Sequence, residues 1–336
     1  MHCYTGQAHR HYHDFMKAFM NTGFPLRTTA TLAAAVLLLA TSGCGTTSPQ
    51  QRDSKPAPIE SLHATPADRM LADAMQRQFV EGAGAALVLV EGAAQKAPDR
   101  PDIAWLQIAL CRMVPGCQPE PLEARLRRLD PGNGIVWLGP LATAQQQRDV
   151  AAENEILDVM SRSERFDIYW NSLAAHIAIA RSQNPNLKPT VLSGGPLTSS
   201  LNDVIGWLSG VALPALSPIS QSCSAQRAAN PTIAARCLGV AQAMQRGDTY
   251  IAEGMGLGIA QRLAPPASLQ SVATDEQIVV SRYQRDTAGQ IMNNQVERER
   301  FTHELLKLMS SLHREQDVFV AVIRWAGQPL MPPPAS

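Results

Sequence analysis

Four cysteines in the body of the chain offer two kinds of chemistry, disulfide formation or zinc binding. They fall into two close pairs, Cys111 with Cys117 and Cys223 with Cys237. The first pair flanks Pro115-Gly116, a dipeptide typical of a turn that brings chain ends together. Neither pair has the short spacing of structural zinc sites or of redox Cys-x-x-Cys motifs. We therefore predict two local disulfides, with a four-cysteine zinc site as the alternative.

Side chains suited to acid–base or metal chemistry are sparse elsewhere. No two of the histidines after Cys44 have the H-E-x-x-H spacing of a zinc protease. His176 lies in an apolar stretch, where a structural histidine is the more common role. Glu253 follows Tyr250 in one helical pattern and is expected to be a buried carboxylate. The sequence thus predicts no catalytic residue, metal or cofactor, and Glu253, Tyr250 and His176 form only a speculative pocket.

The first 43 residues have the order of a secretory signal peptide. Basic residues, Arg27 among them, precede an apolar run over residues 31–40. The run is too short to span a bilayer, which takes about 20 residues. The histidine-rich stretch before Met16 indicates that translation starts at Met16 or Met20, with a metal-binding tract as the alternative.

The segment Thr41-Ser42-Gly43-Cys44 resembles the lipobox of bacterial lipoproteins. Ser42 and Gly43 match the pattern, whereas Thr41 stands where the family usually has leucine or a similar apolar residue. The resemblance implies lipid attachment at Cys44; the alternative is ordinary signal-peptidase cleavage that leaves this cysteine unmodified. Gly45, in place of aspartate, implies sorting to the outer membrane. We therefore expect a protein anchored by lipid to the periplasmic face of the outer membrane.

Composition divides the rest of the chain. Residues 44–60 are polar and rich in proline and serine, which is typical of a flexible tether. Residues 61–328 are rich in alanine and leucine, and only 5% of the whole chain is aromatic, which favours packed helices over sheets. Residues 329–336 form a proline-rich tail. The sequence predicts one helical domain between the tether and the tail.

The charge of the exported chain excludes one class of partner. Residues 1–43 hold three basic residues and one acidic residue, so 26 basic and 28 acidic residues remain after cleavage. The net charge of the remainder is therefore −2. No basic stripe interleaved with aromatic residues is present, and we do not expect nucleic acid as a partner.

An Ile-x-Trp motif recurs four times in the middle of the chain. Its tryptophans are Trp105, Trp137, Trp170 and Trp207, at spacings of 32, 33 and 37 residues. Periods in this range are typical of stacked helical hairpins. The segment Leu129–Asn133 resembles a junction between tetratricopeptide repeats, although the family's aromatic residue seven positions after each tryptophan is absent. We predict an all-α fold in which hairpins stack as a short tetratricopeptide-like solenoid, with an irregular helical bundle as the alternative.

These features favour an interaction protein over an enzyme. A helical repeat presents a concave surface to another protein or a peptide. We therefore expect a lipid-anchored scaffold or interaction module whose partner is another envelope protein or a peptide. The alternative is an envelope enzyme or small-ligand-binding protein with a pocket near Glu253.

Overall fold

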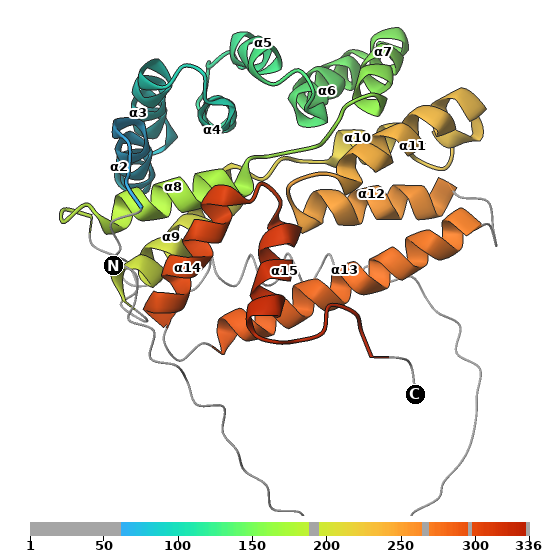
Figure 1. Ribbon diagram of the computed structural model, residues 1–336. Coiled ribbons are helices and arrows are strands. Elements are labelled where there is room, and N and C mark those ends of the chain that lie inside the picture. The colour runs from blue at the N-terminus through green and yellow to red at the C-terminus, as the bar shows by residue number, and fades with distance from the viewer. Residues whose placement is uncertain (1–61, 188–194, 264–268, 295–297, 334–336) are drawn as a thin grey trace, which may run out of the picture. The chain divides into compact units, whose positions relative to one another are not determined.

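The computed structural model describes residues 62–187, 195–263, 269–294 and 298–333, and every regular element within them is a helix (Figure 1). The α-helices are α2 (Pro66–Glu81), α3 (Ala83–Lys96), α4 (Pro101–Cys111), α5 (Glu120–Leu129), α6 (Leu138–Gln147), α7 (Val150–Ser161), α8 (Trp170–Ser182), α9 (Pro196–Val211), α10 (Ser217–Ser222), α11 (Pro231–Gln245), α12 (Tyr250–Leu263), α13 (Leu269–Asn293), α14 (Arg298–Ser311) and α15 (Glu315–Trp325). Two 3₁₀ helices, η2 (Gly134–Trp137) and η3 (Arg227–Ala229), lie between them. The predicted all-α class is confirmed. Within the described ranges, no helix is both long and apolar enough to cross a bilayer.

Local sequence signals explain where many helices begin and end. Thr65 and Asp68 form a reciprocal capping box at the start of α2, and Pro66 occupies the first helical position. α2 ends at Glu81, the following Gly82 has a φ of 92°, which suits glycine, and α3 starts at the next residue. The two helices therefore fold back on each other as a hairpin.

The helices of the unit Glu60–Ser336 pack in a closed circuit. Each helix from α2 to α7 packs against its neighbour in sequence, with η2 linking α5 to α6. α7 then packs on α11, and the circuit continues through α12, α13, α15 and α14. α14 packs on α8, and α8 packs back on α2 (Figure 1). The connections 162–169, 246–249 and 312–314 meet where α8, α12 and α15 begin, so residues distant in sequence lie together there.

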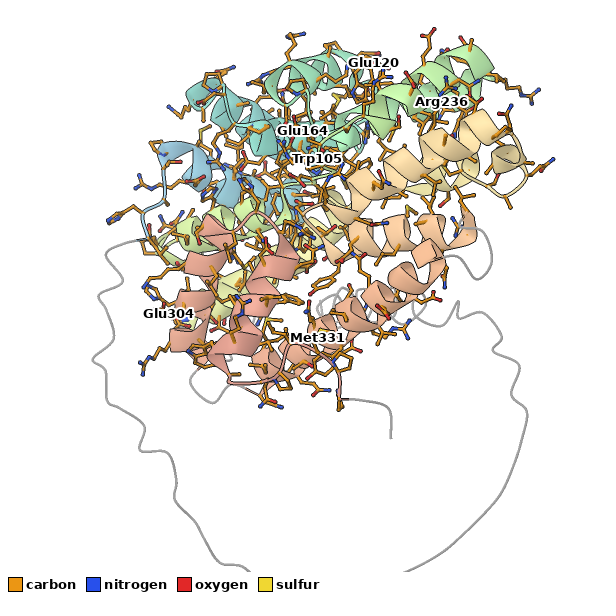
Figure 2. The ribbon with its side chains drawn as sticks, turned by 45° about the vertical axis from the view of Figure 1, so that its right-hand side comes forward. Trp105, Glu120, Glu164, Arg236, Glu304 and Met331 are labelled. Atoms are coloured by element: carbon orange, nitrogen blue, oxygen red, sulfur yellow. A yellow bond between two sulfur atoms is a disulfide. The ribbon has the colours of Figure 1, made fainter. Side chains whose placement is uncertain are left out.

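The four Ile-x-Trp motifs do not occupy equivalent positions in these helices. Trp105 lies inside α4, Trp137 ends η2, Trp170 starts α8, and Trp207 lies in the last third of α9. Trp105 is buried among the helices (Figure 2), and its indole N–H donates to the Ala212 carbonyl. The regular spacing of the tryptophans in sequence thus does not place them at equivalent positions within their helices. Tetratricopeptide-like stacking stays a prediction.

Both predicted disulfides are present. Cys111 and Cys117 are joined around the turn that ends α4, with their Cα atoms 5.4 Å apart. Cys223 and Cys237 join the end of α10 to α11, with their Cα atoms 5.6 Å apart. These sulfurs bond to each other, which contradicts the four-cysteine zinc alternative. By the loop-entropy model each short loop contributes about 2–3 kcal/mol to stability.

Candidate functional site

The predicted pocket residues separate into two clusters. Tyr250 and Glu253 lie one turn apart on α12 and are both buried. His176 lies on α8 and contacts Arg100 and Asp102 at the start of α4 instead. The structure therefore brings together Tyr250 and Glu253 but not His176. Cys44 lies outside the described residues.

The Tyr250–Glu253 cluster is completed by α15. The Gln316 amide donates to the Glu253 carboxylate at 3.0 Å, and the ring of Phe319 lies 5.2 Å from that of Tyr250, centroid to centroid. Burial, and then the charges of Glu253 and Glu315, raise the pKa of the Tyr250 hydroxyl. That hydroxyl and Oε1 of Gln316 are buried without a hydrogen-bond partner among the described residues. The cluster thus contains buried polar atoms that lack a hydrogen-bond partner among the described residues.

A second set of polar side chains, which we call the polar seam, joins three connections between helices to the start of α15. Its members are Asp130, Asn133, Arg165, Asp167, Tyr169, Asp248 and Glu315. Asp130 accepts from the Tyr169 hydroxyl at 2.6 Å and pairs with Arg165, which also pairs with Asp167 at 2.7 Å. Arg165 thus bridges two carboxylates that would otherwise repel.

Asn133 fastens the connection before η2 to the connection before α8. It is fully buried, and its Oδ1 accepts from the backbone N–H groups of Ile135 and Asp167. Its amide donates to the Asp167 carbonyl at 2.9 Å and to Asp130 at 3.1 Å. These hydrogen bonds fix the local backbone conformation, because any other conformation would leave buried polar groups without hydrogen-bond partners.

Asp248 caps α8 from a distance of 78 residues in sequence. Tyr169, the residue before α8, has a φ of 59°, which is uncommon outside glycine, and its side chain does not cap the helix. Asp248 instead accepts from the N–H groups of Ile168 and Trp170, each at 2.9 Å. Its carbonyl accepts from the Glu315 N–H at 2.7 Å. The seam therefore fixes the start of α8 against the starts of α12 and α15.

The seam is rich in carboxyl groups with raised pKa values. Burial raises the pKa of Asp167, and burial together with Asp167 raises the pKa of Asp248 well above its ordinary value. Burial raises the pKa of Glu315 to about 7, although its carboxylate accepts from the Tyr250 N–H at 2.9 Å. Because the members bond to one another, the seam is suited to positioning helices rather than to attacking a substrate.

Raising the pH from 5.5 to 8.5 should destabilise the protein. The pKa of Glu315 is about 7 in the folded protein and near 4.5 in the unfolded chain. Its burial therefore costs the folded state no stability at low pH, and the loss of stability grows as the pH rises toward about 7. Glu315 should contribute about 1–3 kcal/mol to this loss. Urea unfolding followed by circular dichroism measures it, and Glu315→Gln should flatten the pH dependence. Glu155→Gln, on the exposed face of α7, is the control. An equal pH dependence in wild type and Glu315→Gln would contradict the assignment.

His176 belongs to a cluster of ions around Arg100. Arg100 pairs with Asp68 and Asp102, and its Nη2 lies 2.9 Å from Nδ1 of His176. Since a guanidinium can only donate, Nδ1 must accept, and the ring is neutral. Burial, and then the charge of Arg100, lowers the pKa of His176. The histidine is therefore held by a network of buried ions rather than placed beside Tyr250 and Glu253.

An apolar surface, which we call the hairpin patch, lies at the far end of α2. It consists of Phe79, Val80 and Met113, with exposed fractions of 66%, 71% and 47%. Phe79 comes four residues after the buried Met75, so the core-facing side of α2 continues past the core into solvent. Between these residues, Gln78 accepts from the Trp207 indole at 2.7 Å and lies 3.9 Å from the Met113 sulfur.

Sequence patterns contained no signal for several of these residues. Arg100 meets Asp68 and His176, which lie tens of residues away, and the same holds for the partners of Asp248 and Glu315. No spacing rule links such positions. The described residues contain no group of three or more histidine, cysteine or acidic side chains placed to hold a metal ion. Comparison with protein-family models, with curated proteins and with solved structures finds no match.

Proposed function

We propose that this protein is a lipid-anchored module of the cell envelope that binds another protein or a peptide through the hairpin patch. The single observation that carries the proposal is the exposure of Phe79, with Val80 beside it, at the end of a helix whose Phe79 face is core one turn earlier, at Met75. Large apolar side chains that gather in solvent mark interaction surfaces. Stacked hairpins of the tetratricopeptide-like kind that the sequence predicts would present such a patch on a rigid support.

The surroundings of the patch support a protein partner. Gln78 is held by α9 through Trp207 and touches the end of α4 through Met113, so three helices share the patch. The Cys111–Cys117 disulfide restrains the turn that carries Met113. A preorganised apolar surface loses little conformational entropy on binding, which favours affinity.

An envelope enzyme or small-ligand-binding protein is the second candidate. The observation that favours it is the pair of unpartnered buried atoms, the Tyr250 hydroxyl and Oε1 of Gln316, beside Glu253. We rank it second because the Gln316 amide already donates a hydrogen bond to the Glu253 carboxylate. In many proteins, ordered water satisfies buried polar atoms that lack a protein partner.

Replacing Phe79 with aspartate should weaken partner binding on the order of tenfold or more, because apolar anchors at the centre of an interface dominate its affinity. A photo-crosslinking amino acid at Val80 should capture a defined partner in cells, and Phe79→Asp should abolish that product. Val279→Asp is the matched control, since Val279 is also an exposed apolar residue but lies on α13. A crosslinked product that survives Phe79→Asp would count against the patch.

Replacing Cys44 with serine should release the protein from the membrane. The thiol of Cys44 is the atom that would carry the lipid, so the variant should lose both incorporation of labelled fatty acid and membrane association. The measurements are metabolic lipid labelling and membrane fractionation of cells that produce either chain. Unchanged labelling and fractionation in Cys44→Ser would overturn the anchor.

A further inference from the structure

The described chain enters the helical body beside the end of α8. The Gln183 amide, one residue past that helix, donates to the Leu62 carbonyl at 2.6 Å and accepts from the Ala64 N–H at 3.4 Å. Leu62 is therefore held next to the carboxyl end of α8. Any tether that precedes Leu62 reaches the body at this end.

The start of α14 lies at the same end of the body. α14 packs on both α8 and α9 (Figure 1). Asn171, at the start of α8, donates to the carbonyl of Leu312, just past the end of α14, so the two helices run in opposite directions. Glu299, at the start of α14, accepts from the N–H groups of Leu197 and Thr198 in the first turn of α9. The first turn of α14 is thus near the end of α8, where the chain enters.

An aromatic pair, with one ring half-buried and the other exposed, joins this part of α14 to the end of α15. Phe301 contacts Trp325, the last residue of α15, with ring centroids 5.5 Å apart. The exposed fraction of Trp325 is 64%, and Arg324 beside it is also exposed. Glu304, one turn after Phe301, projects from the surface of α14 (Figure 2). We call Phe301, Arg324 and Trp325 the aromatic patch.

The chemistry of the aromatic patch suits the boundary between lipid headgroups and acyl chains. A tryptophan side chain has an apolar body and one N–H donor, and it is enriched at this boundary in membrane proteins. An adjacent arginine attracts lipid phosphate. The net charge of −2 means that this contact depends on the local side chains and not on attraction of the whole body.

We propose that the aromatic patch rests on the phospholipid surface and orients the body on the membrane. The inference rests on the proposed anchor at Cys44. Leu62 comes eighteen positions after Cys44, and even a fully extended chain of that length spans only about 60 Å. A lipid at Cys44 would therefore confine the end of the body that bears the patch near the bilayer, where a weak contact becomes effective.

The hairpin patch lies apart from the entry point of the chain. α2 begins just after Leu62 and has 16 residues, so its far end lies about 24 Å from the entry point. Phe79 and Val80 lie at that far end. The two apolar surfaces thus have different occupants, lipid at the entry end and a protein partner at the far end.

The test uses the full chain purified from bacterial membranes and reconstituted into vesicles of phosphatidylethanolamine and phosphatidylglycerol. The acyl chains carry bromine close to the headgroups, which quenches nearby tryptophan emission. The difference in fluorescence between wild type and Trp325→Phe gives the emission of Trp325 alone. We expect most of this difference to be lost in brominated vesicles. Trp137→Phe is the control, because Trp137 lies on η2 against Arg127, and its contribution should not be quenched.

Flotation of the vesicles separates the two proposals. If wild type floats with the vesicles but the Trp325 emission is not quenched, the inference is overturned and the anchor stands. If wild type does not float, the anchor fails, and the inference fails with it. Quenching of Trp325 and Trp137 to the same extent would also overturn the inference, since it would indicate no preferred orientation.

Discussion

Replacing Arg100 with alanine is expected to lower the free energy of unfolding by about 3–5 kcal/mol. Asp68 and Asp102 are both almost completely buried, and Arg100 forms an ion pair with each. Removing the guanidinium leaves two buried carboxylates without their counter-ion, and a buried ion that loses its partner costs more than the pair contributed. Urea unfolding at neutral pH measures the change.

A matched surface pair provides the control for Arg100. Arg77 pairs with Glu81 one turn away on α2, but both side chains are largely exposed. Exposed pairs of this kind contribute about 0.5 kcal/mol or less, so Arg77→Ala should change stability little. Equal losses in Arg77→Ala and Arg100→Ala would contradict the importance of burial.

Lowering the pH should partly rescue Arg100→Ala. Protonation neutralises carboxylates that have lost their counter-ion, so the variant regains stability as the pH falls. His176 acts in the same direction. Its Nδ1 lies 4.0 Å from Asp102, and the loss of Arg100 removes one of the two causes that lower its pKa in the wild type. The stability gap between variant and wild type should therefore narrow from pH 7 to pH 5.5. A gap that widens would show that the carboxylates are not the source of the loss.

Replacing Asp248 with alanine is expected to cost about 2–4 kcal/mol. The variant leaves the N–H groups of Ile168 and Trp170 without an acceptor in a buried position, and each such group costs about 1–3 kcal/mol. Amide hydrogen exchange should show faster exchange at these two residues before the rest of α8 opens. Asp248→Asn, which keeps one acceptor oxygen, should lose less.

Asp149 is the matched control for Asp248. It also accepts from a helix N-terminus, that of α7, but from a residue three positions away and at an exposed site. Loss of such a local cap costs about 1 kcal/mol. Equal losses in Asp149→Ala and Asp248→Ala would mean that the long-range cap adds nothing beyond a local one.

Features that depend on near neighbours were predictable. Asn230-Pro231 is typical of a helix start, and α11 begins at Pro231 with Asn230 accepting from Thr232 and Ile233. The two disulfides close loops with sequence separations of 6 and 14 residues, so their pairing followed from proximity along the chain. These interactions form within one or two turns, where residue type and spacing carry enough information.

The Ile-x-Trp series shows where a sequence pattern becomes ambiguous. The tryptophans are spaced as in helical repeats, yet Trp170 begins a helix and Trp207 lies near the end of one. A large indole is buried wherever the core has room, and its burial does not specify which turn of a helix carries it. The period therefore predicted helices correctly without defining their register.

The sequence by itself determined the helical class, the paired cysteines and the expectation of a lipid at Cys44, because each depends on composition or on a short motif. Only the tertiary structure decided that Asp248 caps α8, that Arg100 joins His176 to two buried carboxylates, and that Phe79 extends past the core. The physical reason is that a cap or an ion pair between distant residues depends on how helices pack. Many side chains of the same type are equally able to donate or accept until packing brings one of them within reach.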